Sequence, residues 1–223
     1  MTLSELVAQV EKNIGRDDKT DDIPTYINLG LQRIFTDHQS FNAWKKTSYS
    51  TVNPSNPDVN PRFIILPTEL AQLKDVKLRG SDKEIERVTR EEYDEIANYY
   101  EDPEYGVPKY YTAWGNNLEV YPIPKEEVTY YIRWIRKPVE LIEDTDEPVL
   151  PYDELIIASA TTIAYTRLEQ VEQSRNHYNI YQSLLEKAIR TEARRYDDAD
   201  YRLEGYKNSG RNTRQRQIQD QLW

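Results

Sequence analysis

The sequence predicts an α+β protein, mainly α, in which a helical bundle carries a β-rich insertion and an extended C-terminal arm. Three observations support this fold class. Apolar residues recur at helical spacing in the first and last thirds, they alternate at strand spacing in the middle, and the final residues contain few aliphatic side chains. We therefore expect a body over residues 1–197 and an arm over residues 198–223.

Two helices are expected at the N-terminal end, over residues 2–15 and 22–39. Thr2 and Glu5 have the spacing of a capping box, in which each side chain bonds the other residue's backbone N–H. Pro24 is tolerated because it falls in the first turn of the second helix. The connection between the two helices is short, so they should form an αα-hairpin.

The middle of the chain, residues 43–136, is expected to be a β-rich insertion. A turn at residues 115–117 (Gly-Asn-Asn) predicts a hairpin, and Thr89 with Glu92 repeats the capping-box spacing before a short helix over residues 89–100. The longest expected strand covers residues 127–136. Its alternation puts Tyr131, Arg133 and Ile135 on one face and Tyr130, Ile132 and Trp134 on the other.

Two long helices should complete the body, over residues 152–170 and 174–197, after an acidic linker at residues 144–151. The first of the two is apolar on most faces, which is typical of a central helix. The second, at 1.5 Å per residue, should be about 36 Å long. One of its faces carries Tyr178, Tyr181, Leu185, Ala188 and Glu192.

The composition argues against catalysis. The chain has no Cys and only two His, which excludes disulfides, thiolate metal sites and Cys nucleophiles and makes a His-based metal site improbable. The nucleophile elbow and the glycine-rich phosphate loops are missing. The carboxylate pairs, at Asp17–Asp18, Asp21–Asp22, Asp144–Glu147 and Asp197–Asp198, fall at helix ends and linkers, where acids are usually solvated. We expect no catalytic residue, cofactor, metal or membrane span.

The 18 Tyr residues favour a protein that works through contacts, because Tyr combines an apolar ring with a polar edge. Four aromatic residues are candidate subunit contacts: Tyr130, Trp134, Tyr178 and Tyr181. A carbohydrate- or ligand-binding module that uses Trp114, Tyr121 and Trp134 is the alternative. Nucleic-acid binding needs a basic surround. The net charge is -10, and a +2 contribution from residue 199 onward leaves the body near -12, which argues against it.

The arm can be interpreted as a solvated end or as a partner-binding segment. A disordered, solvated end is the usual interpretation of such a segment, and four basic charges are few for nucleic acid. A terminal Trp is nevertheless costly to expose and frequent in binding hot spots. The candidate partner-binding residues of the arm are Arg211, Arg214, Arg216, Ile218, Leu222 and Trp223.

The order of these features resembles the head–tail adaptor (connector) proteins of tailed bacteriophages. The resemblance covers about residues 1–197 and consists of several short motifs. They are YINLGLQRI from Tyr26, GVPKYYTAW from Gly106, LEVYPIP from Leu118, YYIRWIRKP from Tyr130 and DEPVLP from Asp146.

The resemblance implies a structural ring protein without catalytic activity, located in the virion neck and made in the host cytoplasm. Such a ring, usually twelve-fold, docks beneath the portal protein and meets tail or stopper/nozzle proteins at its other end. Double-stranded DNA would pass through its channel without specific binding, and an acidic lining would suit such passage. The binding module stays the alternative, and a hydrolase built on a carboxylate pair is the third hypothesis.

Overall fold

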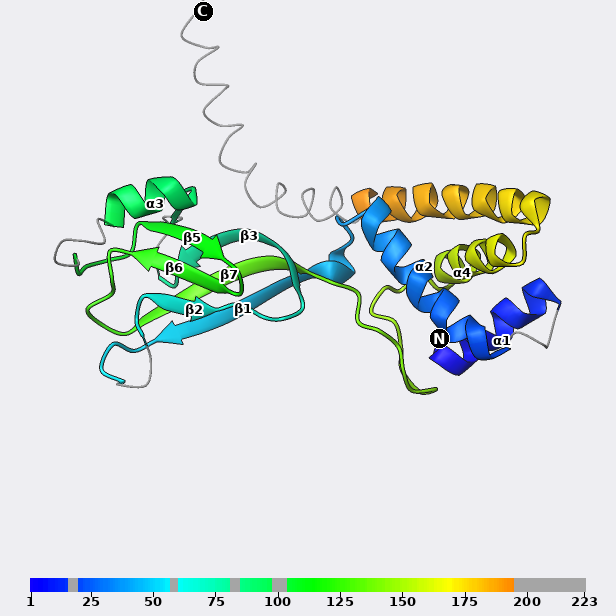
Figure 1. Ribbon diagram of the computed structural model, residues 1–223, viewed down its shortest axis with the longest axis horizontal. Helices are drawn as coiled ribbons and strands as arrows, with labels where there is room; N and C mark the ends of the chain where they lie inside the picture. The colour runs from blue at the N-terminus through cyan, green and yellow to red at the C-terminus, as the bar shows by residue number, and fades with distance from the viewer. Residues whose placement is uncertain (16–19, 57–59, 81–84, 98–103, 195–223) are drawn as a thin grey trace, which may run out of the picture. The chain divides into compact units, whose positions relative to one another are not determined.

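A computed structural model describes residues 1–15, 20–56, 60–80, 85–97 and 104–194 and divides the chain into two compact units (Figure 1). The helical unit combines Met1–Asn42 with the chain from Glu140 onward, and the β unit is Ala43–Val139. The protein is a mixed α+β protein. In the described part of the chain, every helix is too short or too polar to cross a membrane.

The helical unit contains four α-helices. They are α1 (Leu3–Ile14), α2 (Ile23–Asp37), α4 (Asp153–Arg167) and a last helix described over residues 171–194. The predicted capping box of α1 is confirmed, because the Glu5 carboxylate accepts from the Thr2 N–H at 2.9 Å and the Thr2 hydroxyl accepts from the Glu5 N–H. Pro24 lies in the first turn of α2, where its missing N–H costs no helical hydrogen bond.

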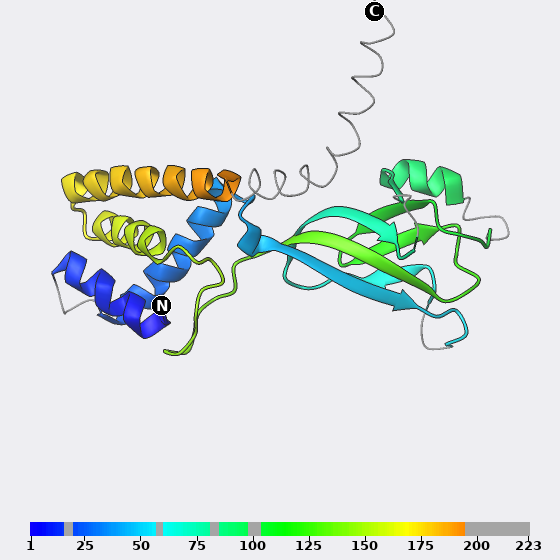
Figure 2. The same ribbon diagram turned by 180° about the vertical axis from the view of Figure 1, so that it is seen from behind.

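Helix α4 is the central element of this unit. It packs against α1 and α2, and Figures 1 and 2 both show it beside the last helix. It passes close to Gly30 of α2, where a Cβ atom would lie 3.2 Å from the Ala160 backbone nitrogen. The Ser159 hydroxyl donates to the Gly30 carbonyl at 3.3 Å across the same contact. A small residue at position 30 therefore lets the two helices come together.

The last helix begins at residue 171, three residues before its predicted start. Helix α4 ends at Arg167, so only three residues connect the two helices. Glu169 adopts a left-handed conformation with φ 58°, and the Gln170 N–H donates to the Tyr165 carbonyl, which closes the end of α4. Because this turn is so short, Val171 belongs to the last helix, whereas the sequence predicted a connecting segment there. Residues 195–197 of the predicted helix lie outside the described residues.

Two sheets form the β unit. Sheet A has the order β1 (Lys45–Val52), β7 (Val128–Arg136), β3 (Leu70–Leu78), all antiparallel. Sheet B has the order β2 (Phe63–Ile65), β6 (Asn117–Tyr121), β5 (Tyr110–Trp114), β4 (Glu86–Arg87). The expected hairpin is confirmed as β5–β6, and its turn places Gly115 at φ 60°.

The two sheets pack face to face around one hydrophobic core. The predicted grouping of Tyr130, Ile132 and Trp134 on one face of β7 is confirmed, and this face is the inner one, because all three are buried in the core with residues from sheet B such as Leu118 and Val120. Helix α3 (Arg90–Ala97) covers part of the outer face of sheet B, where the Tyr93 hydroxyl donates to the Val120 carbonyl at 3.0 Å. Among the described residues of the β unit, no helix covers the outer face of sheet A (Figure 1).

Candidate interaction surfaces

Three of the four predicted subunit contacts are interior residues. Tyr130 and Trp134 point into the core between the sheets, because pleating turns alternate residues of β7 inward. Tyr181 is buried against α2 and donates a 2.6 Å hydrogen bond to Asp37 Oδ2. Their rings therefore pack within this chain, and the prediction that they form a contact surface between subunits is corrected. Burial raises the pKa of both Tyr130 and Tyr181.

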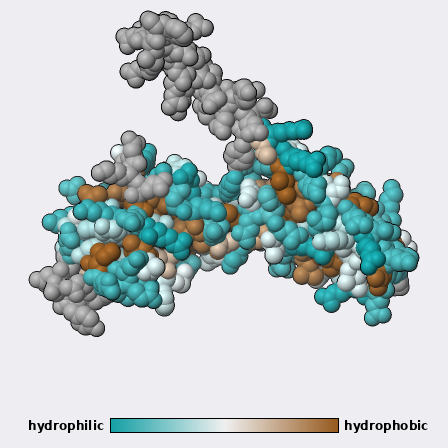
Figure 3. Space-filling view, turned by 90° about the horizontal axis from the view of Figure 1, so that it is seen from above, coloured by the Kyte–Doolittle hydropathy of each residue, from teal (hydrophilic) through white to brown (hydrophobic). Residues whose placement is uncertain are grey.

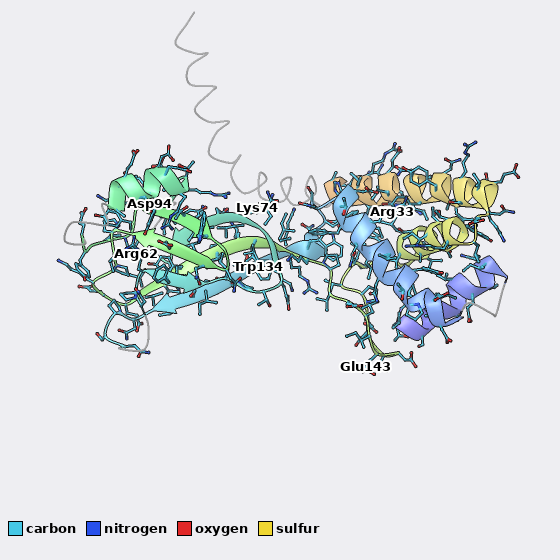
Figure 4. The ribbon with its side chains drawn as sticks, viewed as in Figure 1. Arg33, Arg62, Lys74, Asp94, Trp134 and Glu143 are labelled. Atoms are coloured by element: carbon cyan, nitrogen blue, oxygen red, sulfur yellow. The ribbon has the colours of Figure 1, made fainter. Side chains whose placement is uncertain are left out.

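Tyr178 is the fourth candidate, and 41% of its surface is exposed. The Arg33 guanidinium of α2 lies 5.4 Å from the Tyr178 ring centre and 5.6 Å from that of Tyr181, within cation–π distance of both (Figure 4). Beside them lies a hollow of about 420 Å³ whose lining includes Arg33, Tyr178 and Val171. Val171 is 70% exposed. We call Arg33, Val171 and Tyr178 the Tyr178 surface.

The β unit has a second exposed apolar group at one end of sheet B. Ile65 and Trp114 both pair with Asn117, from opposite sides, so the three residues form a row on one face of the sheet. Ile65 is 77% exposed and Trp114 62% exposed. The sequence offered little sign of this row, because it depends on how β2 and β5 pair with β6. We call Ile65, Asn117 and Trp114 the Trp114 row.

A buried charge cluster lies next to this row. Glu119 of β6 is buried, and its carboxylate pairs with Arg90 at 2.6 Å and with Arg62 at 3.7 Å. Arg90 also pairs with Asp94 at 3.1 Å and places its guanidinium 5.7 Å from the Trp114 ring centre (Figure 4). The cluster connects α3 to sheet B, so the Glu119 carboxylate has a structural role.

The predicted carbohydrate platform does not form. Of its three rings, only Trp114 is exposed. Tyr121 is buried with Tyr93 under α3, and Trp134 points into the core from the other sheet. Stacking on a sugar requires rings that share one open face, so this arrangement disfavours the alternative of a binding module.

Acidic residues of the predicted linker stabilise the fold. The Asp146 carboxylate accepts from the Ile142 and Glu143 N–H groups at 2.8 and 2.9 Å, and these hydrogen bonds lower its pKa. The Asp144 and Asp146 carbonyls accept from Ser4 and Leu3, which satisfies N–H groups at the start of α1. The segment is therefore an ordered loop that caps a helix.

Glu192, on the last helix, is also a structural acid. Its buried carboxylate accepts from the Tyr152 hydroxyl at 2.8 Å and from the Asn42 N–H at 3.3 Å. Within the described ranges no three His, Cys, Asp or Glu side chains gather as a metal site would require. The pairs Asp17–Asp18 and Asp197–Asp198 lie outside the described residues, as do all six candidate residues of the arm.

The face of each unit that Figure 3 shows is mostly hydrophilic, with hydrophobic residues in small patches. Two comparisons with known proteins bear on what these surfaces do. A family model described as SU10 adaptor protein matches residues 1–206, a range that includes the whole β unit and all the described residues of the helical unit. No curated protein matches the chain.

Proposed function

Because the chain belongs to the SU10 adaptor protein family, we propose that it is a structural ring protein of the neck of a tailed bacteriophage. In this role it docks beneath the portal protein, meets tail or stopper proteins on the other side, and surrounds the channel through which DNA leaves the capsid. The family match across both units is the observation that carries the proposal. It supports a virion component that acts in assembly, and the role we propose includes no enzymatic step.

Three acidic residues have structural roles, which supports a function without catalysis. Glu119 and Glu192 are buried and paired, and Asp146 holds its own loop together. A carboxylate that serves as a general acid or base must be able to exchange its proton with a substrate, whereas these three are committed to arginine, hydroxyl or backbone donors.

Contacts between copies are assigned to two exposed groups, one in each unit. The Tyr178 surface combines an exposed aliphatic residue, a half-exposed ring and a guanidinium, a mixture that is enriched in protein interfaces. The Trp114 row adds an exposed Trp and an exposed Ile, one on each side of Asn117. The arm, with Arg211, Arg214, Arg216, Ile218, Leu222 and Trp223, is assigned to the portal or to a neighbouring copy.

The proposal is tested by producing the chain together with the portal protein of the same phage and imaging the complexes by electron microscopy. A ring of this chain on the portal is the expected result. Its absence from every portal-containing ring, under conditions in which portal rings form, would contradict the proposal. Deleting residues 200–223 should leave the body folded and weaken the assembly, while undiminished assembly would show that the arm is only a solvated end.

The Tyr178 surface is tested with Val171→Asp. Residue 171 opens the last helix, and an acid there suits the positive end of the helix dipole, so the fold should be kept. The substitution puts a charge in an apolar contact and should reduce ring formation at least tenfold, a loss of about 1.4 kcal/mol. Gln173→Asp is the matched control, because it adds the same charge to an exposed polar position in the same turn. Equal assembly by the two variants would remove Val171 from the contact.

A further inference from the structure

Sheet A has a charge opposite to that of the chain. Its three strands contain six basic residues and one acid, a net +5, whereas the whole chain carries -10. The basic residues are Lys45, Lys46, Lys74, Lys77, Arg133 and Arg136, and the acid is Asp75. The rest of the chain must then carry -15, so positive charge is concentrated on this sheet.

The strand register shows which residues share the outer face. Tyr49, Tyr131 and Lys77 lie opposite one another in one row. Thr47, Arg133 and Asp75 form the next row, and Thr51 pairs with Thr129 at the far end. Tyr49 is 63% exposed, and Thr47, Thr51 and Arg133 are exposed as well. The face therefore carries tyrosine and threonine hydroxyls beside Lys77 and Arg133, whereas Lys46 and Arg136 alternate toward the other face of the sheet.

A hollow of about 430 Å³ opens at one end of this sheet. Lys45, Lys46, Lys74 and Arg133 contribute to its lining. Lys74 lies at a β-bulge between Leu73 and Asp75 and is exposed (Figure 4). The single acid of the lining, Asp75, accepts from Arg133 Nε at 2.7 Å, so its charge is already balanced. With the Asp75–Arg133 pair neutral, Lys45, Lys46 and Lys74 give the lining a net charge of +3, which favours an anionic group.

We propose that the outer face of sheet A, with the hollow at its end, binds nucleic acid through the sugar–phosphate backbone. Lys, Arg, Thr and Tyr are the side chains that contact phosphates in protein–DNA complexes, and such contacts do not depend on base sequence. From Lys45 to Thr51 the face extends about 20 Å along the strands, enough to follow about six base pairs of a duplex. The proposal does not depend on the adaptor role.

Two features favour nucleic acid over an acidic protein and over base stacking. Lysine is depleted in protein–protein interfaces, whereas here it supplies most of the charge. The Tyr49 ring already contacts the Tyr131 ring at a centroid distance of 5.3 Å and the Arg79 guanidinium at 5.9 Å. Those contacts hold Tyr49 within the protein surface, so its hydroxyl, more than its ring face, is offered to a ligand.

The test is fluorescence anisotropy of the full chain with a labelled duplex between 50 and 200 mM salt. With about four phosphate contacts, log K should fall with a slope near -3.6 against log[salt], a loss of about 150-fold over this range. Neutralising two exposed lysines of the hollow with Lys46→Gln and Lys74→Gln should weaken binding at least tenfold and reduce the slope by about 1.8. Lys109→Gln with Lys125→Gln is the matched control, because both lysines are exposed in the β unit and lie outside sheet A.

Three results would overturn the proposal. The first is no duplex binding at the lowest salt, or equal effects of the two double variants. The second is that another copy of the chain, and not DNA, occupies the face. In that case DNA does not bind, and sedimentation velocity shows an oligomer that the double variant Lys46→Gln with Lys74→Gln no longer forms. The third is tighter binding of a single strand than of the duplex, with that preference lost on Tyr49→Ala, which would assign the face to base stacking.

Discussion

Replacing Tyr181 with phenylalanine should lower the free energy of unfolding of the helical unit by about 1.5 kcal/mol and leave the β unit unchanged. The ring stays buried in the variant, so packing is kept and only the 2.6 Å hydrogen bond to Asp37 Oδ2 is lost. A hydrogen bond to a charged group contributes about 1.5–3 kcal/mol. The lower end applies here, because Asp37 is exposed and its carboxylate regains water when the hydroxyl is removed.

Asp37→Asn is the control that separates the hydrogen bond from the charge. Asp37 is the last residue of α2, where a negative charge opposes the helix dipole by about 0.3–1 kcal/mol. Asparagine keeps an acceptor oxygen for Tyr181 and removes this repulsion. The free energy of unfolding should therefore change by less than about 0.5 kcal/mol, and the effects of the two substitutions should not add in the double variant.

The two units can be followed separately in one urea titration. Three of the four Trp residues, at positions 44, 114 and 134, belong to the β unit, so Trp fluorescence reports on that unit. Circular dichroism at 222 nm reports mainly on the helical unit, since the eight-residue α3 is the one α-helix among the described residues of the β unit. An unchanged midpoint by circular dichroism for Tyr181→Phe, or a larger loss for Asp37→Asn, would refute the assigned contribution of the hydrogen bond.

Two further predictions use the same signals. Burial raises the folded-state pKa of Tyr130 and of Tyr181 above the unfolded value of about 10, so both units should lose stability as pH rises above about 10, and Tyr181→Phe should reduce that loss only in circular dichroism. Equal alkaline sensitivity of the variant would contradict this. Gly30→Val should destabilise the helical unit by about 2 kcal/mol, since its Cβ would approach the Ala160 nitrogen to 3.2 Å, while Gly30→Ala should cost less because alanine favours the helix. An unchanged urea midpoint for Gly30→Val would show that α4 can move away.

The features that were predicted correctly from the sequence are local ones. The capping box of Thr2 with Glu5 needs only residues three apart, and both of its hydrogen bonds are present. Thr89 and Glu92 form the same pair of bonds at the start of α3. The grouping of Tyr130, Ile132 and Trp134 on one face of β7 follows from alternation within a single strand. In each case the determining interactions lie within a few residues, so composition and spacing are sufficient.

The errors concern contacts between distant segments. Tyr178 and Tyr181 fall on the same predicted helix face and both lie beside Arg33 of α2. Tyr181 is nevertheless buried, with its hydroxyl bonded to Asp37, while Tyr178 stays partly exposed. The Trp114 row depends on two strands, far apart in the sequence, that pair with one residue of β6. Helical and strand periodicity describe a face but not its partner, so which aromatic rings remain exposed was not predictable.

The same limit applies to charge, and here it changes a conclusion about function. The net charge of -10 argued against nucleic-acid binding. A net charge is a sum over the whole chain, however, and does not say where the charges lie. A phosphate on sheet A responds mainly to charges within about one Debye length, 8–10 Å in ordinary salt, since more distant charges are screened. At the hollow, strand pairing brings Lys45, Lys46, Lys74 and Arg133 together with one acid, Asp75, a net charge of +3. Because these residues come from three strands that are distant in the sequence, a chain that is acidic in total has a local basic site that its composition conceals.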